Sequence, residues 1–356
     1  MIYRLKDEKY RFFYLFNSET GAYVRSGIID ENGKDTGIDP FMASFPHLID
    51  VGIMGHCIHG RTGLCVKAGI GCYQSGLLVE QPNMSVEDFA WIAGQCKGRC
   101  NQFALGGRGD PDQHESFEEI LKISVENKIV PNFTTSGYGM TAETAALCRK
   151  YCGAVAVSWY RSEYTLKAID LLMEAGVKTN VHYVLGKNSI DEALQRLKED
   201  DFPDGINAVI FLLHKPVGQG SSENVLSSDD PRVMEFFKQI DVRHKFKVGM
   251  DSCNVPGAVN FCRNVFPASM DTCEGGRFSC YIGPDMVMVP CSFDQNRYYG
   301  VSLREMNIET AWNSDKFETF RGYLRNACPN CNKRELCMGG CPITPEIVFC
   351  NSPERR

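Results

Sequence analysis

Short apolar runs alternate with amphipathic stretches through the middle of the chain. The runs have the length and composition of buried strands, and the stretches carry apolar residues at helical spacing. We expect strands within 47–54, 102–107, 129–137, 153–159, 177–186 and 207–216, and helices at Val86–Ala93, His114–Val125, Ala142–Tyr151, Tyr164–Ala175, Ile190–Glu199 and Pro231–Ile240. Six such units with short connections predict an α/β fold, a parallel sheet with outer helices that forms an open, partial (β/α)6 barrel.

The two ends of the chain lack this alternation. Near the start, "YRFFYLF" and "AYVRSGI" flank the turn "NSETG" and predict a β-hairpin, which a polar linker follows. The last hundred residues are rich in loops, have short hairpin-like stretches such as "SCYIGPDMVMVPCSF", and hold most of the cysteines. We therefore expect a hairpin extension over 1–45, the barrel over 46–250, and over 251–356 a domain that folds around metal.

Composition narrows the classes of partner. The chain has 356 residues, of which 43% are apolar, so it can bury a sizeable core without covalent staples. Its net charge of −6 argues against a nucleic-acid partner. No apolar run reaches the roughly 18 residues of a membrane span, and the first residues lack the layout of a secretory signal. These features predict a cytoplasmic protein without a membrane partner.

The seventeen cysteines are far more than packing requires. In a reducing compartment, so many cysteines indicate metal binding. The alternative is a secreted protein in which the cysteines form disulfides. The odd count, the missing signal and the tight clustering all favour metal.

The densest cluster is "CPNCNKRELCMGGC", in which four cysteines have spacings of x2, x5 and x3. Thiolates this close converge on one metal centre, and a structural zinc knuckle is one interpretation. A single zinc ion cannot use all the cysteines of the region, however, and eight of them suit two four-thiolate clusters. These eight are Cys273, Cys280, Cys291, Cys328, Cys331, Cys337, Cys341 and Cys350.

This arrangement resembles the SPASM domain of radical S-adenosylmethionine (SAM) enzymes, and the resemblance extends over about residues 46–350. It implies two auxiliary [4Fe–4S] clusters with crossed ligation. Carried over by position, Cys273, Cys280, Cys291 and Cys341 hold the first cluster, and Cys328, Cys331, Cys337 and Cys350 hold the second. The chain departs from the family at Met286, where a glycine is usual, and at Cys280, a ligand that some members lack. Without Cys280 the first cluster has an iron open to substrate.

The same family binds a third [4Fe–4S] cluster through three cysteines in the loop after the first strand, most often at x3 and x2 spacing. Here that loop holds Cys57, Cys65 and Cys72 at x7 and x6 spacing, with glycines that let a longer loop wrap a cluster. Cys96 and Cys100, spaced x3, are a competing choice, but they precede the second strand. In the family, SAM binds the open iron of this cluster and is cleaved to a 5′-deoxyadenosyl radical.

The resemblance also implies residues that bind SAM. In "LGGRGDP", after the second strand, Gly106, Gly107, Gly109 and Asp110 match a family motif that receives the amino group of SAM. Further candidates at or near later strand ends are Thr135, Ser136, Ser158, Arg161 and His182. As an alternative to SAM binding, the serines and the threonine could simply form turns at the strand ends. Arg161 could equally be a solvated surface residue. His214 and Lys215 are candidates for substrate contact, whereas Cys148, Cys152, Cys253 and Cys262 are interpreted as packing residues.

Relatives of this kind mostly modify ribosomally made peptides or residues of partner enzymes. The leading hypothesis is a maturase that removes a hydrogen from a precursor peptide. A narrower resemblance to maturases of nif11-like peptides includes spliceases, which excise tyramine at a Tyr-Gly site and leave a β-amino acid. Alternatives are a crosslinking or epimerising maturase, a sulfatase-maturing enzyme that forms formylglycine, and a non-catalytic iron–sulfur carrier. The expected partners are the peptide, a separate leader-binding protein and a flavodoxin- or ferredoxin-type reductant.

Overall fold

The computed structural model describes residues 2–59, 63–76, 78–264, 266 and 269–351. Its centre is a sheet whose six middle strands are parallel, in the order β9-β8-β7-β6-β5-β4. These strands are β4 (Leu48–Met54), β5 (Gln102–Gly107), β6 (Val130–Thr135), β7 (Val155–Ser158), β8 (Thr179–Leu185) and β9 (Ala208–Leu213). Each corresponds to one of the six runs that the sequence predicts, so the parallel sheet is confirmed.

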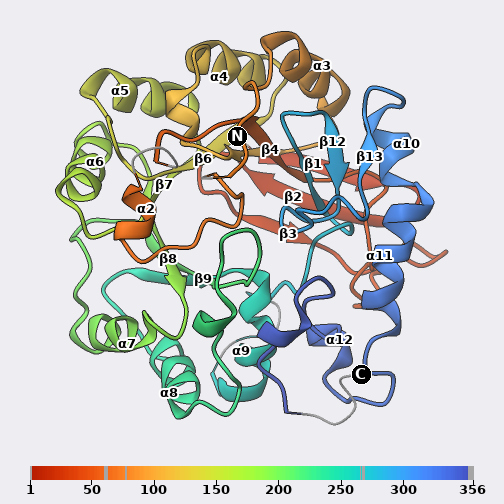
Figure 1. Ribbon diagram of the computed structural model, residues 1–356. Helices are drawn as coiled ribbons and strands as arrows, with labels where there is room; N and C mark the ends of the chain where they lie inside the picture. The colour runs from red at the N-terminus through yellow and green to blue at the C-terminus, as the bar shows by residue number, and fades with distance from the viewer. Residues whose placement is uncertain (1, 60–62, 77, 265, 267–268, 352–356) are drawn as a thin grey trace.

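Six helices cover the outer side of these strands (Figure 1). They are α3 (Val86–Cys96), α4 (Phe117–Glu126), α5 (Ala142–Tyr151), α6 (Glu163–Glu174), α7 (Ile190–Glu199) and α8 (Pro231–Ile240). Their apolar faces pack on the sheet, and residues such as Ile92, Ile120 and Leu172 are fully buried there. This core fixes the strands, so that the loops at their carboxyl ends start from a rigid frame.

The sheet continues beyond the predicted units on both sides. On one side β10 (Lys247–Met250) pairs in parallel with β9, a strand that the sequence interpretation missed. On the other side β11 (Ser279–Ile282) pairs in parallel with β4. From β11 the antiparallel strands β12 (Val287–Val289) and β13 (Val301–Ser302) complete a ten-stranded sheet. The C-terminal region is therefore joined to the barrel through backbone hydrogen bonds.

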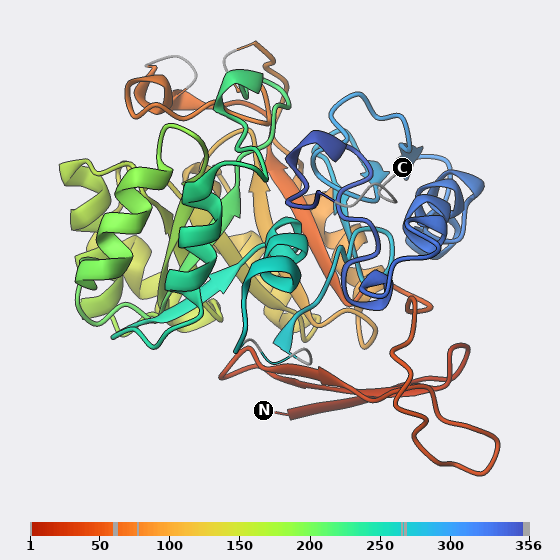
Figure 2. The same ribbon diagram turned by 90° about the horizontal axis from the view of Figure 1, so that it is seen from below.

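A separate antiparallel sheet lies across one end of the barrel, opposite the loop that carries α2 (Figure 2). It consists of β1 (Ile2–Asp7), β2 (Phe12–Asn17) and β3 (Tyr23–Arg25). The predicted hairpin is confirmed as β2 and β3, and β1 is an additional strand. The alternating residues Phe12, Tyr14 and Phe16 are buried, and the Tyr14 ring stacks on His47 at a centroid distance of 3.9 Å.

Short helices and loops dominate the rest of the chain. Among the described residues, the other helices are α2 (Leu64–Lys67), α9 (Val255–Phe261), α10 (Ile308–Trp312), α11 (Asp315–Asn326) and α12 (Arg334–Cys337), with single turns η1 (Pro111–Gln113), η2 (Ser222–Asn224), η3 (Ser252–Asn254) and η5 (Pro345–Ile347). None of the helices within the described residues combines the length and the apolar character needed to cross a membrane.

Candidate functional site

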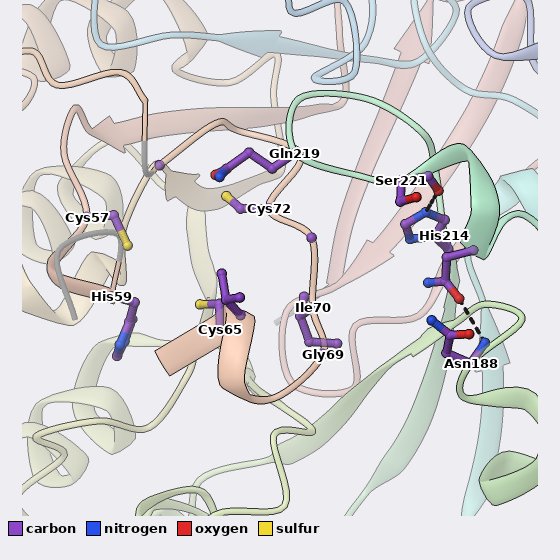
Figure 3. A pocket seen from close by; sticks show the side chains of 14 residues that line it. Cys57, His59, Cys65, Gly69, Ile70, Cys72, Asn188, His214, Gln219 and Ser221 are labelled. Carbon is purple, nitrogen blue, oxygen red and sulfur yellow. Dashed lines mark hydrogen bonds between the residues drawn. The ribbon is translucent and has the colours of Figure 1, made fainter. Parts of the chain in front are cut away.

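Three cysteines gather at the carboxyl end of the sheet, in the loop that follows β4. Cys57 comes just after the strand, Cys65 lies on α2, and Cys72 follows that helix. All three line one cavity of about 260 Å³, together with His59 and with His214 from the end of β9. Figure 3 shows their sulfur atoms gathered around a common space. The unusual spacing therefore still brings the three thiols together.

Close backbone packing fixes the start of this loop. Gly107, at the end of β5, has a φ of +115°, and a Cβ there would lie 2.4 Å from the carbonyl oxygen of Met54. A Cβ at Gly76 would lie 3.1 Å from Cβ of Cys57 and 3.6 Å from Sγ of Cys72. Gly107 therefore requires glycine, and Gly76 is a tight position that lies between the first and third cysteines.

Loops after other strands brace the rest of the cysteine loop. The backbone N–H of Gln219 donates to the carbonyl oxygen of Cys72 at 2.9 Å, which ties the loop to the segment after β9. The Arg161 guanidinium, after β7, donates to the carbonyl oxygen of Ala68 at 3.4 Å. A long cysteine loop is thus held from two sides by parts of the barrel that are distant in sequence.

The chemistry of the three side chains suits an iron–sulfur cluster. Burial raises the pKa of Cys65 to about 11, a hydrogen bond with Tyr160 opposes this, and the neighbouring Cys57 and Cys72 add to it. Such buried sulfur is stabilised as thiolate when metal binds it. No disulfide forms among the seventeen cysteines. Within the described part of the chain, no three His, Cys, Asp or Glu side chains are close enough to hold a single metal ion.

A buried hydrogen-bonded group lies beside the cysteine loop. The carboxylate of Asp110 accepts hydrogen bonds from the backbone N–H of Ser136 at 2.8 Å and from the Ser136 hydroxyl at 2.5 Å. Nε2 of His59 lies 2.8 Å from the same carboxylate and 2.7 Å from the hydroxyl. Asp110 and Ser136 were candidates from the sequence, and His59, only two residues from Cys57, connects both to the loop.

The other candidates for SAM binding lie in more varied surroundings. Gly109 packs against the Cys57 backbone, and a Cβ at Gly106 would meet nothing within 4 Å. Thr135 accepts a hydrogen bond from the N–H of Gly137, and the carbonyl oxygen of Ser158 accepts one from the N–H of Tyr160. These contacts hold the ends of β6 and β7, and the described lining of the cysteine cavity includes neither side chain.

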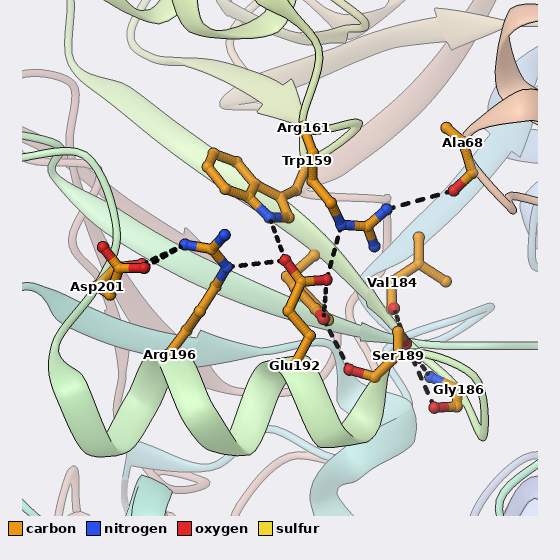
Figure 4. Close-up of polar contacts among 10 residues, drawn as sticks. Ala68, Trp159, Arg161, Val184, Gly186, Ser189, Glu192, Arg196 and Asp201 are labelled. Atoms are coloured by element: carbon orange, nitrogen blue, oxygen red, sulfur yellow. Dashed lines mark hydrogen bonds and ion pairs between the residues drawn. The ribbon is translucent and has the colours of Figure 1, made fainter.

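Arg161 and His182 are engaged within the protein. Nε of Arg161 lies 2.7 Å from the Glu192 carboxylate, which also accepts from Arg196 and Trp159 (Figure 4). His182 hydrogen-bonds with Thr134 and lines a second cavity of about 300 Å³ that the N-terminal sheet borders. Burial lowers the pKa of His182 to about 4, so its ring is neutral. Neither side chain lines the cysteine cavity among the residues described.

The competing cysteines lie at the opposite end of the strands. The Cys100 thiol donates to the carbonyl oxygens of His47 and Gln102, at 3.3 Å each, close to the amino ends of β4 and β5. Cys96 is fully buried and hydrogen-bonds with Cys100. This position separates the pair from the loop that carries Cys65, and it favours a packing role.

Four of the C-terminal cysteines surround a cavity of about 190 Å³. They are the four that the sequence assigns to the second auxiliary cluster, Cys328, Cys331, Cys337 and Cys350. Burial, followed by the nearby Cys328, Cys350 and Cys331, raises the pKa of Cys337 above its usual value. A cluster bound there would receive ligands from both sides of α12.

Another cavity, of about 170 Å³, is lined by the four cysteines of the first auxiliary set, Cys273, Cys280, Cys291 and Cys341, and also by Cys253. A hydrogen bond from Cys253, with further ones from Thr344, lowers the pKa of Cys341 to about 6 despite its burial. Met286 has a φ of 61°, in the left-handed region that favours glycine, which agrees with the glycine that the family resemblance implies at this position.

His214 and Lys215 separate at the end of β9. His214 lines the cysteine cavity, and its Nε2 lies 2.9 Å from the carbonyl oxygen of Ser221. Lys215 is buried, and its Nζ lies 2.6 Å from the Asp251 carboxylate and 4.4 Å from the centre of the Phe293 ring. Burial lowers the pKa of Lys215, but Asp251 and then Cys253 outweigh this effect and raise it. Lys215 therefore stays charged beside the first auxiliary cavity.

Comparison with known families and structures agrees with this geometry. Residues 273–338 match the model of the SPASM family, described as an iron–sulfur cluster-binding domain. No curated protein matches the chain. The fold resembles Streptococcus suis SuiB bound to its precursor peptide SuiA, with a TM-score of 0.70, 14% identity and coverage of 98% of each chain.

Two other solved structures are similar. SuiB bound to SAM has a TM-score of 0.64 and 16% identity, over 88% of this chain and 76% of that one. Native anSMEcpe with bound SAM has a TM-score of 0.60 and 16% identity, over 86% and 92%. The expected fold and the SPASM resemblance are thus confirmed.

Proposed function

We propose that this chain is a radical SAM enzyme that modifies a residue of a ribosomally made precursor peptide. The observation that carries the proposal is the cavity at the carboxyl end of the sheet, into which Cys57, Cys65 and Cys72 turn their thiols. Three thiolates leave one iron of a [4Fe–4S] cluster without a protein ligand. When bound together, such a cluster and SAM supply a 5′-deoxyadenosyl radical that removes a hydrogen atom from the substrate.

The residues of this chain bind and orient these groups in the proposal. Cys57, Cys65 and Cys72 hold the cluster, and the backbone after β5, from Gly106 to Asp110, lies against the start of their loop. The buried group of Asp110, Ser136 and His59 fixes that backbone to the end of β6. Since these contacts already exist within the protein, the binding surface is preorganised.

Support for a peptide substrate comes from proteins with the same fold. SuiB has been crystallised with the precursor peptide SuiA, and anSMEcpe with SAM and the Cp18Cys peptide. The second of these has a TM-score of 0.60 and 15% identity to this chain. We extend the same class of substrate to this chain, whose cysteine cavity opens beside His214 and Asn188.

Two auxiliary [4Fe–4S] clusters complete the proposal. The thiols around the two C-terminal cavities are suitable donors, since both sets consist of cysteines that form no disulfide. Such clusters carry electrons to or from the product, and a flavodoxin- or ferredoxin-type protein is the proposed reductant.

The first test measures iron and SAM cleavage. The anaerobically reconstituted full chain should hold about twelve irons, from three four-iron clusters, and should release 5′-deoxyadenosine under reduction. A variant with alanine at Cys57, Cys65 and Cys72 should keep about eight irons and lose the cleavage. Four or fewer irons, or wild-type protein that leaves SAM intact, would favour a non-catalytic iron–sulfur carrier and overturn the proposal.

The second test identifies the reaction. The chain is co-expressed with candidate precursor peptides encoded beside its gene, and the peptide mass is compared with that from the variant in which Cys57, Cys65 and Cys72 are alanine. Loss of the mass of tyramine identifies the splicease that we propose as the subtype. Loss of two hydrogens indicates a crosslink, and one mass unit gained in heavy water indicates epimerisation. Oxidation of a Cys or Ser in a sulfatase peptide would instead support the formylglycine-forming alternative.

A separate leader-binding protein is a further part of the proposal. The outer face of the N-terminal sheet offers it a surface, since Phe13 and Leu15 on β2 and Val24 on β3 are 45%, 44% and 62% exposed. Leu15 and Val24 pair directly across the two strands, so these side chains form one apolar patch.

A further inference from the structure

Five cysteines line the first auxiliary cavity, although a [4Fe–4S] cluster takes at most four cysteine ligands. Three of them are close together. A Cβ at Gly275 would lie 3.6 Å both from Sγ of Cys273 and from Cβ of Cys291, and Cys341 is among the groups that act most strongly on both thiols. The remaining position falls to either Cys253 or Cys280, and the contacts of these two residues differ.

Cys253 is in direct contact with this group. It lines the cavity together with Cys341, and its thiol interacts with the sulfur of that residue, which accepts a hydrogen bond from the backbone N–H of Thr344 at 3.4 Å. We propose that Cys253, and not Cys280, is the fourth cysteine ligand of the first auxiliary cluster. This inference rests on the proposed iron–sulfur chemistry of the chain, and it reverses the interpretation of Cys253 as a packing residue.

The element that carries Cys253 is anchored on both sides. Cys253 lies on η3, where the preceding Asp251 accepts hydrogen bonds from the Leu213 backbone N–H at 3.2 Å and from Lys215 Nζ at 2.6 Å. The fully buried Asn254 donates from its side chain to the carbonyl oxygen of Phe211 at 3.1 Å. These bonds fix η3, and with it the backbone of Cys253, to the end of β9.

Cys280 belongs to the sheet. It lies in β11, opposite Ile49 of the parallel strand β4, and is 2% exposed. The ionisable groups that act most strongly on its thiol are Cys100, Asp50 and Arg321. Cys280 therefore borders the cavity from the sheet, on the side of Cys100, and the ladder of backbone hydrogen bonds to β4 fixes its backbone in that position.

The charge around Cys253 agrees with a ligand position. A [4Fe–4S] cluster with four thiolates is an anion, and burying an anion requires a nearby positive group. The ammonium group of Lys215, which is paired with Asp251, is buried near Cys253 and Cys341 and is the positive group on this side of the cavity. Full ligation by Cys253 leaves no iron open to the peptide. In this proposal, the first auxiliary cluster, which lies next to the end of β9, transfers electrons and does not bind the substrate directly.

The test uses the full chain with Cys57, Cys65 and Cys72 replaced by alanine, so that only the auxiliary clusters remain, with about eight irons. In this background Cys253→Ala should lower the iron content and produce the EPR signal of an oxidised [3Fe–4S] cluster. Cys280→Ala should retain about eight irons and the parent spectrum. Cys253→Ser keeps the volume of the side chain and should change the spectrum in the same direction as Cys253→Ala.

Loss of iron in Cys280→Ala alone, or unchanged spectra in both Cys253 variants, would overturn the assignment. If Cys253→Ala and Cys280→Ala both lose iron, Cys280→Val decides, because valine fills the buried space without a thiol. If Cys280→Val keeps the parent EPR spectrum and about eight irons, Cys253 is supported as the ligand. If Cys280→Val loses the cluster, the assignment to Cys253 is overturned. SAM cleavage is measured separately in the wild-type chain, so failure of the proposed function is distinguishable from failure of this ligand assignment.

Discussion

Gly107 connects the stability of the barrel to the position of the cysteine loop, and Gly107→Ala tests that connection. Its φ of +115° is outside the range that alanine adopts without strain, and the new Cβ would lie 2.4 Å from the carbonyl oxygen and 2.8 Å from the nitrogen of Met54. Both contacts are with backbone atoms of β4, three residues before Cys57. A side-chain rotation cannot relieve them, so the strand end has to move.

The magnitude follows from two contributions. Holding a non-glycine residue in this region of φ costs about 1–3 kcal/mol. Moving Met54 breaks the 2.9 Å hydrogen bond from the Arg108 N–H to the Met54 carbonyl oxygen, which contributes about 1 kcal/mol. We expect Gly107→Ala to lower the free energy of unfolding by about 2–4 kcal/mol. We also expect it to reduce the iron bound at the Cys57 loop.

Two variants serve as controls in urea unfolding. Gly106→Ala changes the neighbouring glycine, whose Cβ would meet nothing within 4 Å, and should leave the free energy of unfolding nearly unchanged. Gly94→Ala, within α3 and equally open, should increase it by about 0.5–1 kcal/mol through helix propensity. If Gly107→Ala unfolds within about 0.5 kcal/mol of wild type and keeps all its iron, the reasoning from this close contact is wrong.

Four further variants test other parts of the structure. Cys65→Ala should abolish SAM cleavage and spare the auxiliary clusters, whereas retained cleavage, measured as 5′-deoxyadenosine, would move the site to Cys96 and Cys100. Gly218→Ala should remove iron only from the Cys57 loop, because its Cβ would lie 2.8 Å from the Cys72 carbonyl oxygen; iron analysis that finds all three clusters contradicts this. Burial, then Asp110, raises the pKa of Asp112 to about 7, so the folded chain retains a proton that the unfolded chain releases above about pH 4. Stability from this group is therefore lost as pH rises toward 7, and the advantage of Asp112→Asn in urea unfolding should be larger at about pH 8 than at about pH 6. Phe13→Asp should weaken pull-down of the leader-binding partner without changing SAM cleavage, and unchanged capture would exclude this sheet face.

The strands and helices of the barrel were predictable because their signal is local. Each expected run between 47–54 and 207–216 contains a strand, since buried parallel strands are apolar along most of their length. The missed strand β10, Lys247–Met250, pairs with one neighbour at the sheet edge and has partly exposed side chains. Its short sequence therefore lacks the continuous apolar pattern of the inner strands.

The candidate site was predictable from the sequence where its cysteines lie close together along the chain. The x2 and x5 spacing brings Cys328, Cys331 and Cys337 to one cavity, whereas Cys341, three residues further along, lines the other cavity. His59 carried a weaker signal, its position beside Cys57. Its link to Asp110 depends on the packing of two loops, which no local pattern encodes.

The same distinction explains why the sequence alone suggests a packing role for Cys253. An isolated cysteine has the sequence signature of a buried apolar residue, because nothing in its neighbourhood repeats at ligand spacing. Its position near Cys341 arises from Asp251 and Asn254, whose side chains bind the end of β9, and from β11, which brings the C-terminal cysteines back to the sheet. A ligand supplied in this way joins the barrel to the cluster domain. In this proposal, loss of the first auxiliary cluster should loosen the end of β9, where His214 borders the cavity lined by Cys57, Cys65 and Cys72.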